Sequence, residues 1–193
     1  NKDSTTTLSG ANTYSGVTTV DSGVLRVTGS LDGTPTINIS KGATLKVVED
    51  KESKKVGELN DSVAVNLAQD ANYISDTDDA IGAISGEGAI KLYNANKTLT
   101  VGGIGDDFTF AGVISGQGNF TKDGSGIFSI SSNNALQLTG KTGETGKTTA
   151  KAGTIDFGTT SQTIHSLVVE PDAKVSNGRL DVDTLMNKRS GNI

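Results

Sequence analysis

Residues 112–120 read GVISGQGNF, and residues 82–90, thirty positions earlier, read GAISGEGAI. Five of these nine positions are identical, and the last position is apolar in both copies. Residues 8–23 and 138–153 are similar in the same way, because LSG and GVTT in the first stretch correspond to LTG and GKTT in the second. Self-similarity of this kind is typical of solenoids, in which each repeat stacks on the next.

The stretches between the glycines alternate apolar and polar residues. Such stretches occur at 24–27 (VLRV), 36–39 (TINI), 44–47 (TLKV), 97–101 (KTLTV) and 127–130 (IFSI). A period of two predicts short strands with one buried face. Another stretch, 62–71 (SVAVNLAQDA), could hold one helical turn. We therefore expect an all-β fold, a parallel β-helix of roughly eight coils with about 20–25 residues in each.

The composition fits one long and narrow core. Gly is frequent, with 25 copies, while apolar residues make up only 33% of the chain. A narrow core needs only one or two apolar side chains from each strand, so we expect a single domain over residues 1–193. Cys is absent. Stability must then come from hydrogen bonds between coils and from ladders of interior side chains, since disulfides cannot contribute.

The charge balance narrows the classes of partner. The net charge of −5 argues against nucleic acid, because binding phosphates requires a basic face. No apolar run approaches the roughly 20 residues that span a bilayer, so we expect no direct membrane insertion of this segment. The chain opens with polar residues at Asn1, and we expect it to be processed or excised from a longer protein.

Residues 112–157 resemble the passenger-associated transport repeat of autotransporters. That repeat reads approximately G-x-I-S-G-x-G-x-L-x-K-x-G-x-G-x-L-x-L-x-G-x-N-x-Y-x-G-x-T-x-V-x-x-G-x-L. The matching residues are Ile114, Ser115, Gly116, Gly118, Phe120, Lys122, Gly124, Gly126, Phe128, Ile130, Leu138, Gly140, Gly146, Thr148, Gly153 and Ile155. The later part departs from the repeat at 142–144 (TGE), whereas 12–16 (NTYSG) keeps the Asn and Tyr.

The resemblance implies a right-handed, single-stranded parallel β-helix that is secreted or displayed on a bacterial surface after export through the outer membrane. A signal peptide would precede this segment in the intact protein. Members of the family act as adhesins, self-associating factors, proteases, esterases or toxins, so the fold does not determine the function. Some act as mitogens on endothelial cells through a growth-factor receptor.

Two short motifs resemble ligand sites but lack required residues. Residues 143–148 (GETGKT) resemble the end of a P-loop, but Lys141 occupies a position where that motif requires Gly. Residues 102–107 (GGIGDD) match the first positions of a Ca²⁺-binding nonapeptide. That motif needs tandem copies, and Thr109 stands where it requires a large apolar residue. We therefore expect no cofactor and no metal ion.

Two further motifs fail in the same way. Residues 76–79 (DTDD) are acidic, but Ile81 stands where an EF-hand loop requires Gly. Residues 123–126 (DGSG) contain the residues of a serine-protease nucleophile segment in the wrong order. A catalytic triad would also need a His, and the one His, His165, lies in a strand-like run. We predict that the chain is not an enzyme.

One segment, residues 48–80, breaks the repeat pattern, and we expect an irregular excursion from the β-helix there. It contains a dense run of mixed charge. Loops on solenoids often carry the interaction surface, although a solvated loop without a partner is the simpler alternative. The candidate partner-binding residues are Glu49, Asp50, Lys51, Glu52, Lys54 and Lys55. Deleting 50–55 should leave folding intact and weaken binding.

The function predicted from these features is that of a monomeric virulence factor that binds a host-cell surface protein or receptor. One form of it would be a released ligand that activates a growth-factor receptor on endothelial cells and promotes angiogenesis. The alternative is an adhesin or a self-associating surface protein that mediates attachment or aggregation. A third possibility is a scaffold whose activity lies elsewhere in the intact protein.

Overall fold

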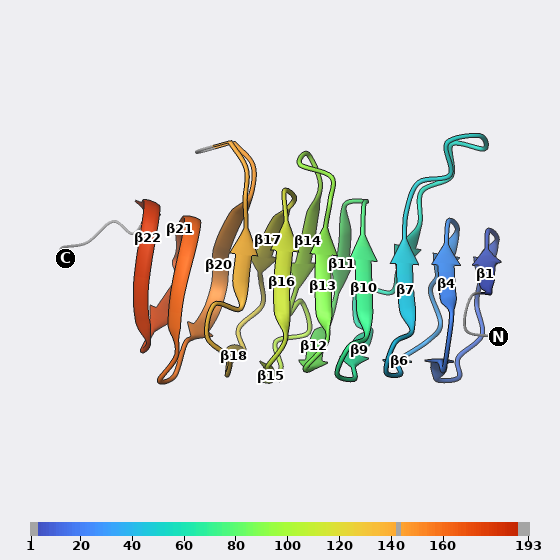
Figure 1. The fold of residues 1–193 in the computed structure, drawn as a ribbon, viewed down its shortest axis with the longest axis horizontal. Coiled ribbons are helices and arrows are strands. Elements are labelled where there is room, and N and C mark those ends of the chain that lie inside the picture. Colours follow the sequence, from blue (N-terminus) through green and yellow to red (C-terminus); the bar gives the residue numbers. More distant parts are fainter. Residues whose placement is uncertain (1–3, 142–143, 189–193) are drawn as a thin grey trace.

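The computed structural model describes residues 4–141 and 144–188, which fold into a right-handed parallel β-helix (Figure 1). Within these ranges the chain forms 22 strands and no helix. It winds from the N-terminal coil at the right of Figure 1 to the C-terminal coil at the left, and the strands form three sides of the solenoid.

Side 1 faces the viewer in Figure 1 and is a seven-stranded sheet. Its strands are, in spatial order, β1 (Thr5–Leu8), β4 (Val24–Val27), β7 (Thr44–Val47), β10 (Asn72–Ser75), β13 (Ala89–Leu92), β16 (Val113–Gly116) and β19 (Leu136–Leu138). Together with the two long strands that follow them, they mark about nine coils, one more than the sequence predicts.

Side 2 begins where the chain turns over the upper edge of Figure 1. Its strands are β2 (Ala11–Asn12), β5 (Ser30–Leu31), β8 (Glu58–Leu59), β11 (Asp79–Ile81), β14 (Thr98–Val101), β17 (Asn119–Lys122) and the first part of β20 (Lys147–Asp156). Side 3 returns the chain to side 1. Its strands are β3 (Thr18–Val20), β6 (Thr36–Ile39), β9 (Ala64–Leu67), β12 (Ala83–Gly86), β15 (Phe108–Phe110), β18 (Ile127–Ile130) and the second part of β20.

The last two strands run along more than one side without a break. β21 (Ser161–Ser176) pairs with both parts of β20, and β22 (Arg179–Asn187) pairs with the first part of β21. Every pairing between these strands is parallel, so each coil repeats the direction of the coil before it.

Alternation within each strand forms the core. In β4, β6, β7 and β9 every second side chain is buried, as the period of two in the sequence predicts. Large side chains fill the C-terminal half of the solenoid, where the Phe108 and Phe128 rings stack at 4.9 Å between centroids. Phe120 lies against Phe128 at 5.7 Å. Burying such a side chain stabilises the fold by about 1.5–3 kcal/mol.

The repeated ISG triplet ends in a glycine that the fold requires. Gly86 and Gly116 have φ of 99° and 120°, a region that side chains with a Cβ rarely adopt. A Cβ on Gly116 would also collide with the Leu92 carbonyl of the preceding coil. Two independent constraints therefore explain why the repeat keeps this residue.

The structure corrects two predictions in the segment 48–80. Residues 62–71 form no helical turn, because Val63, Val65 and Leu67 are apolar at every second position and β9 occupies this stretch. The irregular part is also shorter than predicted. It covers 49–56 only, and β8, β9, β10 and β11 follow it as regular strands.

Candidate functional site

The predicted excursion is an ordered hairpin over 49–56. Glu49 and Val56 form an antiparallel bridge, the one such bridge among the described residues outside the named strands. The Asp50 N–H donates to the Lys55 carbonyl at 2.7 Å, and the Lys54 N–H donates to the Asp50 carbonyl at 2.8 Å. These bonds order the hairpin without any contact outside the chain.

The tip of this hairpin is a turn that Asp50 organises. Its Oδ1 accepts the N–H of Glu52 at 3.0 Å and that of Ser53 at 3.4 Å. These two backbone hydrogen bonds, the Glu52 bond first, lower the pKa of the Asp50 carboxyl. The Lys55 ammonium donates to the Ser9 carbonyl at 3.1 Å, which ties the hairpin to the first coil. Figure 1 shows the hairpin rising above side 1 and bending toward the N-terminal coils.

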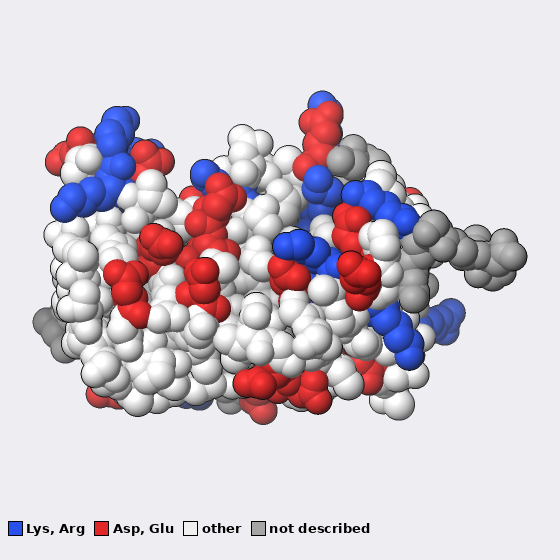
Figure 2. All heavy atoms as spheres, turned by 180° about the vertical axis from the view of Figure 1, so that it is seen from behind, with Lys and Arg blue, Asp and Glu red and all other residues white. Residues whose placement is uncertain are grey.

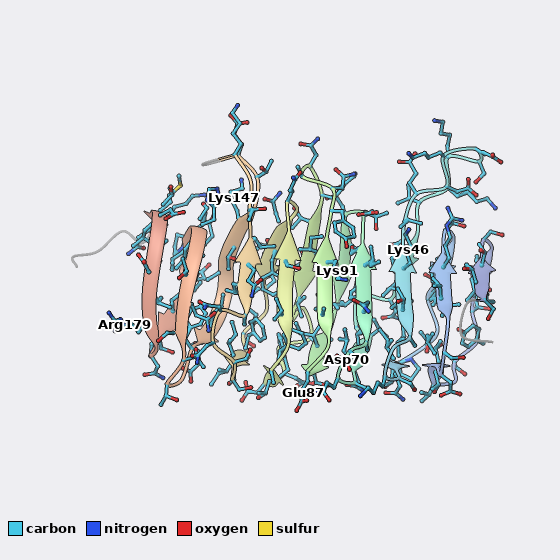
Figure 3. The ribbon with its side chains drawn as sticks, viewed as in Figure 1. Lys46, Asp70, Glu87, Lys91, Lys147 and Arg179 are labelled. Carbon is cyan, nitrogen blue, oxygen red and sulfur yellow. The ribbon has the colours of Figure 1, made fainter. Side chains whose placement is uncertain are left out.

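A hollow of about 560 Å³ lies between the hairpin and the outer face of side 1. Arg26 on β4 and Lys46 on β7 are in-register neighbours in its floor, and neither forms an ion pair in the described part of the chain. The hairpin residues Glu49 to Glu52 line the same hollow. Figure 3 shows Lys46 on side 1 of the solenoid, with Lys91 on the same side.

A second hollow of about 320 Å³ lies on the other side of the hairpin. One wall is Val48, Glu49 and Lys51, and the other is Tyr93 and Asn94 from the turn after β13. Asp76 lines both hollows. Its Oδ1 is buried and has no hydrogen-bond partner. We call this second hollow the Tyr93 cleft.

The hairpin belongs to a row of projections along one edge of the solenoid. The hairpin, the turn 93–97 and the segments 139–141 and 144–146 all lie where the chain passes from side 1 to side 2. They belong to every second coil, and the corners between them, at 76–78 and 117–118, are short. Figure 1 shows the row along the upper edge, and Figure 2 shows the charged hairpin at the upper left when seen from behind. We call this row the projecting edge.

The structure places all six predicted partner-binding residues in the hairpin, but in different environments. Glu49, Asp50, Lys51 and Glu52 line the first hollow, whereas Lys54 and Lys55 do not. Sequence reasoning missed four residues that line the two hollows, namely Arg26, Lys46, Asp76 and Tyr93. Lys46 lies in the same coil as the hairpin, and the other three residues come from three other coils. The only available signal was that the polar break at 93–97 is longer than its neighbours.

A buried carboxyl lies close to this edge but faces the core. Asp79 is only 7% exposed and accepts hydrogen bonds from the Leu59 N–H (3.2 Å), the Ala80 N–H (3.1 Å) and the Tyr73 hydroxyl (3.3 Å). Burial raises its pKa to about 7, and these hydrogen bonds oppose the rise. Burial also raises the pKa of Tyr73. Asp79 and Tyr73 are both buried in the core, so we assign this pair a structural role.

The lysine of the repeat motif is also internal. Lys122 is fully buried, and its ammonium donates to the carbonyls of Asp123 (2.6 Å), Gly124 (2.9 Å) and Ala152 (3.3 Å). Burial lowers the pKa of Lys122. The Asp123 carboxylate faces outward and pairs with Lys151 at 2.6 Å. Lys122 thus joins two coils at the corner between sides 2 and 3.

The other motifs found in the sequence form turns and strand ends. Residues 102–107 form a corner in which the Asp107 carboxylate accepts the Ile127 N–H at 2.7 Å. His165 contacts Asp183 at 3.4 Å, at a different corner from 123–126. Gly143 of the motif at 143–148 lies outside the described residues, and Lys147 begins β20. Within the described ranges, no three acidic, His or Cys side chains are grouped to hold a metal ion, and no helix could span a membrane.

Residues 3–27 match a family model described as Passenger-associated-transport-repeat. This stretch contains Asn12, Tyr14 and Gly16, so the match covers the N-terminal copy of the repeat. Neither the curated proteins nor the solved structures include a match. The repeat match and the parallel β-solenoid together support an autotransporter passenger β-helix, a class that is secreted or displayed at the cell surface.

Proposed function

We propose that this chain is a non-enzymatic passenger that binds a host-cell surface protein through its projecting edge. The observation that carries the proposal is the hairpin 49–56, which leaves the solenoid as an element held by an antiparallel bridge and its own hydrogen bonds. Its internal hydrogen bonds reduce the conformational entropy that is lost on binding. Charged side chains of both signs on the hairpin favour a polar protein surface as the partner.

The more specific form of this proposal is a released ligand that activates a growth-factor receptor on endothelial cells. A row of three projections at every second coil can contact several points of one partner. Receptor activation requires such a defined contact surface, and it does not require a catalytic group. In this form the chain acts as a monomer and as a virulence factor.

A second candidate is self-association, and side 3 supports it. One row of outward residues from β3 to β18 is uncharged and polar, and the Asn66 amide donates to the Asn38 amide oxygen at 2.9 Å. This row consists of Thr19, Asn38, Asn66, Ser85, Thr109 and Ser129. A flat row of polar side chains can pair with the same row of a second copy, as an aggregating surface protein would require.

The test uses the labelled chain on cultured endothelial and epithelial cells. Saturable binding, together with receptor tyrosine phosphorylation within minutes in one cell type, is expected for the receptor ligand. Saturable binding without phosphorylation would instead indicate an adhesin. If neither appears and sedimentation shows concentration-dependent dimers, self-association replaces host binding as the function. Absence of all three would refute both proposals.

A further inference from the structure

The Tyr93 cleft lies over the fourth coil, which has a short corner in place of a projection. The hairpin leaves the third coil and the turn 93–97 leaves the fifth, so the two walls are about 10 Å apart, at about 4.8 Å for each coil. The short corner of the fourth coil, with Asp76, forms the floor. A volume of about 320 Å³ accommodates one side chain and excludes a folded element.

The acceptors in this cleft lack donors. The Asp76 side chain forms no hydrogen bond or ion pair with the described residues, and its Oδ1 is shielded from solvent. A shielded carboxylate oxygen without a donor is unfavourable, so a donor that reached Asp76 would be stabilised there. Glu49 adds a second carboxylate to the lining, and it forms no ion pair with a described residue.

The neighbouring cations leave this charge uncompensated. Lys97 is held by Asp78 at 2.8 Å, and Glu49 contributes only a weaker long-range effect to the raised pKa of Lys97. Arg26 and Lys46 line the first hollow together with Asp76 and Glu49, but neither cation forms an ion pair with a described residue. Lys51 lines the cleft and forms no ion pair among the described residues, so the lining carries two carboxylates against one ammonium.

Tyr93 determines which cation fits. Its side chain forms one wall and is 55% exposed, an unusual position for a large aromatic ring. A cation over an aromatic face is favourable, and the planar guanidinium of arginine can stack on the ring while its N–H groups point to carboxylates. An anion would meet two carboxylates, and an apolar group would leave Asp76 without a donor.

We propose that the Tyr93 cleft binds an arginine side chain of the partner protein, with Asp76 and Glu49 as acceptors and the Tyr93 ring as the stacking face. The assignment of that side chain to a host-cell protein rests on the proposed function. The chemistry of the cleft does not, and it can be tested with a small probe.

The probe is N-acetyl-arginine amide, and its uncharged analogue N-acetyl-citrulline amide has nearly the same shape. Both are titrated into the isotope-labelled chain, and the amide signals are followed by NMR. We expect saturable shifts confined to 48–51, 76 and 93–94 with the arginine probe, and at least tenfold weaker binding of the citrulline probe. Equal responses to the two probes, or no response, would overturn the proposal.

Three variants localise the site. Asp76→Asn and Glu49→Gln should each weaken the arginine probe about tenfold, while Asp61→Asn, at an exposed corner between sides 2 and 3, should leave it unchanged. The NMR spectrum reports folding of each variant, and Glu49→Gln, on the exposed hairpin, serves if Asp76→Asn fails to fold. Undiminished binding in the folded variants would contradict the assignment.

The same variants separate this inference from the proposed function. Arginine binding without any cell binding would support an arginine site in the Tyr93 cleft and refute the proposal that the chain binds a host-cell protein. Cell binding that persists in a variant that has lost arginine binding would overturn the role of the cleft in partner binding and leave the proposed function standing.

Discussion

Replacing Asp79 by Asn should remove a large pH dependence of stability from this fold. Burial raises the pKa of the Asp79 carboxyl, three hydrogen-bond donors only partly offset this rise, and the charge of Glu58 adds to it. Its pKa is about 7 in the folded chain against an ordinary value of 3.8. A difference of about three pH units, at about 1.4 kcal/mol for each, corresponds to about 4 kcal/mol.

The sign follows from which state binds the proton more tightly. Because the pKa is raised on folding, the protonated carboxyl favours the folded state. This contribution is fully present below about pH 4 and is lost as the pH rises to about 7. An Asn side chain does not titrate, and its carbonyl can still accept the N–H groups of Leu59 and Ala80. Relative to the parent chain, Asp79→Asn should therefore gain about 4 kcal/mol of stability between pH 4 and pH 8.

Equilibrium unfolding in urea, followed by circular dichroism from pH 4 to pH 8, measures this difference. Asp61→Asn is the matched control, because Asp61 is exposed and its substitution removes the same charge from the chain. The reasoning is refuted if the stability difference between Asp79→Asn and the parent chain is independent of pH, or if Asp61→Asn reproduces it.

Three further substitutions test the fold by the same unfolding measurement. Lys122→Met removes the hydrogen-bond donor to three carbonyls and should lower the free energy of unfolding by about 2–4 kcal/mol. An unchanged free energy of unfolding would show that those carbonyls need no donor. Phe128→Ala removes a ring that stacks on Phe108 and should cost about 3–5 kcal/mol, unless the coil collapses around the cavity. Gly116→Ala should lower the free energy of unfolding by about 1–3 kcal/mol, because Gly116 has a positive φ and its new Cβ would collide with the Leu92 carbonyl. The control is Gly16→Ala, where a Cβ meets no atom within 4 Å, and it should change the free energy of unfolding by less than about 0.5 kcal/mol. Equal effects of the two substitutions would contradict the role given to the repeat glycine.

Much of the fold could be predicted because a solenoid is built from local patterns. The period of two in TLKV at 44–47 predicts which side chains of β7 are buried, and the ISG triplet predicts the corner at Gly116. Both features depend only on neighbouring residues and on the coil directly below. The predicted number of coils is one too low, because β21 and β22 run along two or three sides without the glycine breaks that delimit earlier strands.

The limits of the excursion could not be predicted in the same way. Its charged run was visible at 49–55, but the helical turn expected at 62–71 and the acidic stretch 76–79 made the pattern appear broken up to Ala80. β8 contains only Glu58 and Leu59, which is too short for a period to be recognised.

The contacts across coils were beyond the reach of the sequence. Asp76 and Tyr93 meet the hairpin because their coils stack on it, and their separation along the chain does not reveal this. The burial of Asp79 and Lys122 was likewise not evident, since charged residues at strand ends are usually exposed. In the structure Lys122 is an inward residue of the alternating strand β17, and its carbonyl partners come from two different coils.

The central claim is that the projecting edge, through its hairpin, carries the binding function of the solenoid. Replacing residues 50–55 by the dipeptide Asn-Gly closes the hairpin with a two-residue turn and keeps the bridge between Glu49 and Val56. The control is Lys41→Ala on the opposite edge, where Lys41 forms only an exposed pair with Asp70. We predict that both variants keep the circular dichroism spectrum and melting behaviour of the parent chain, and that only the hairpin variant loses saturable binding to host cells. Undiminished binding by the folded hairpin variant would contradict the account.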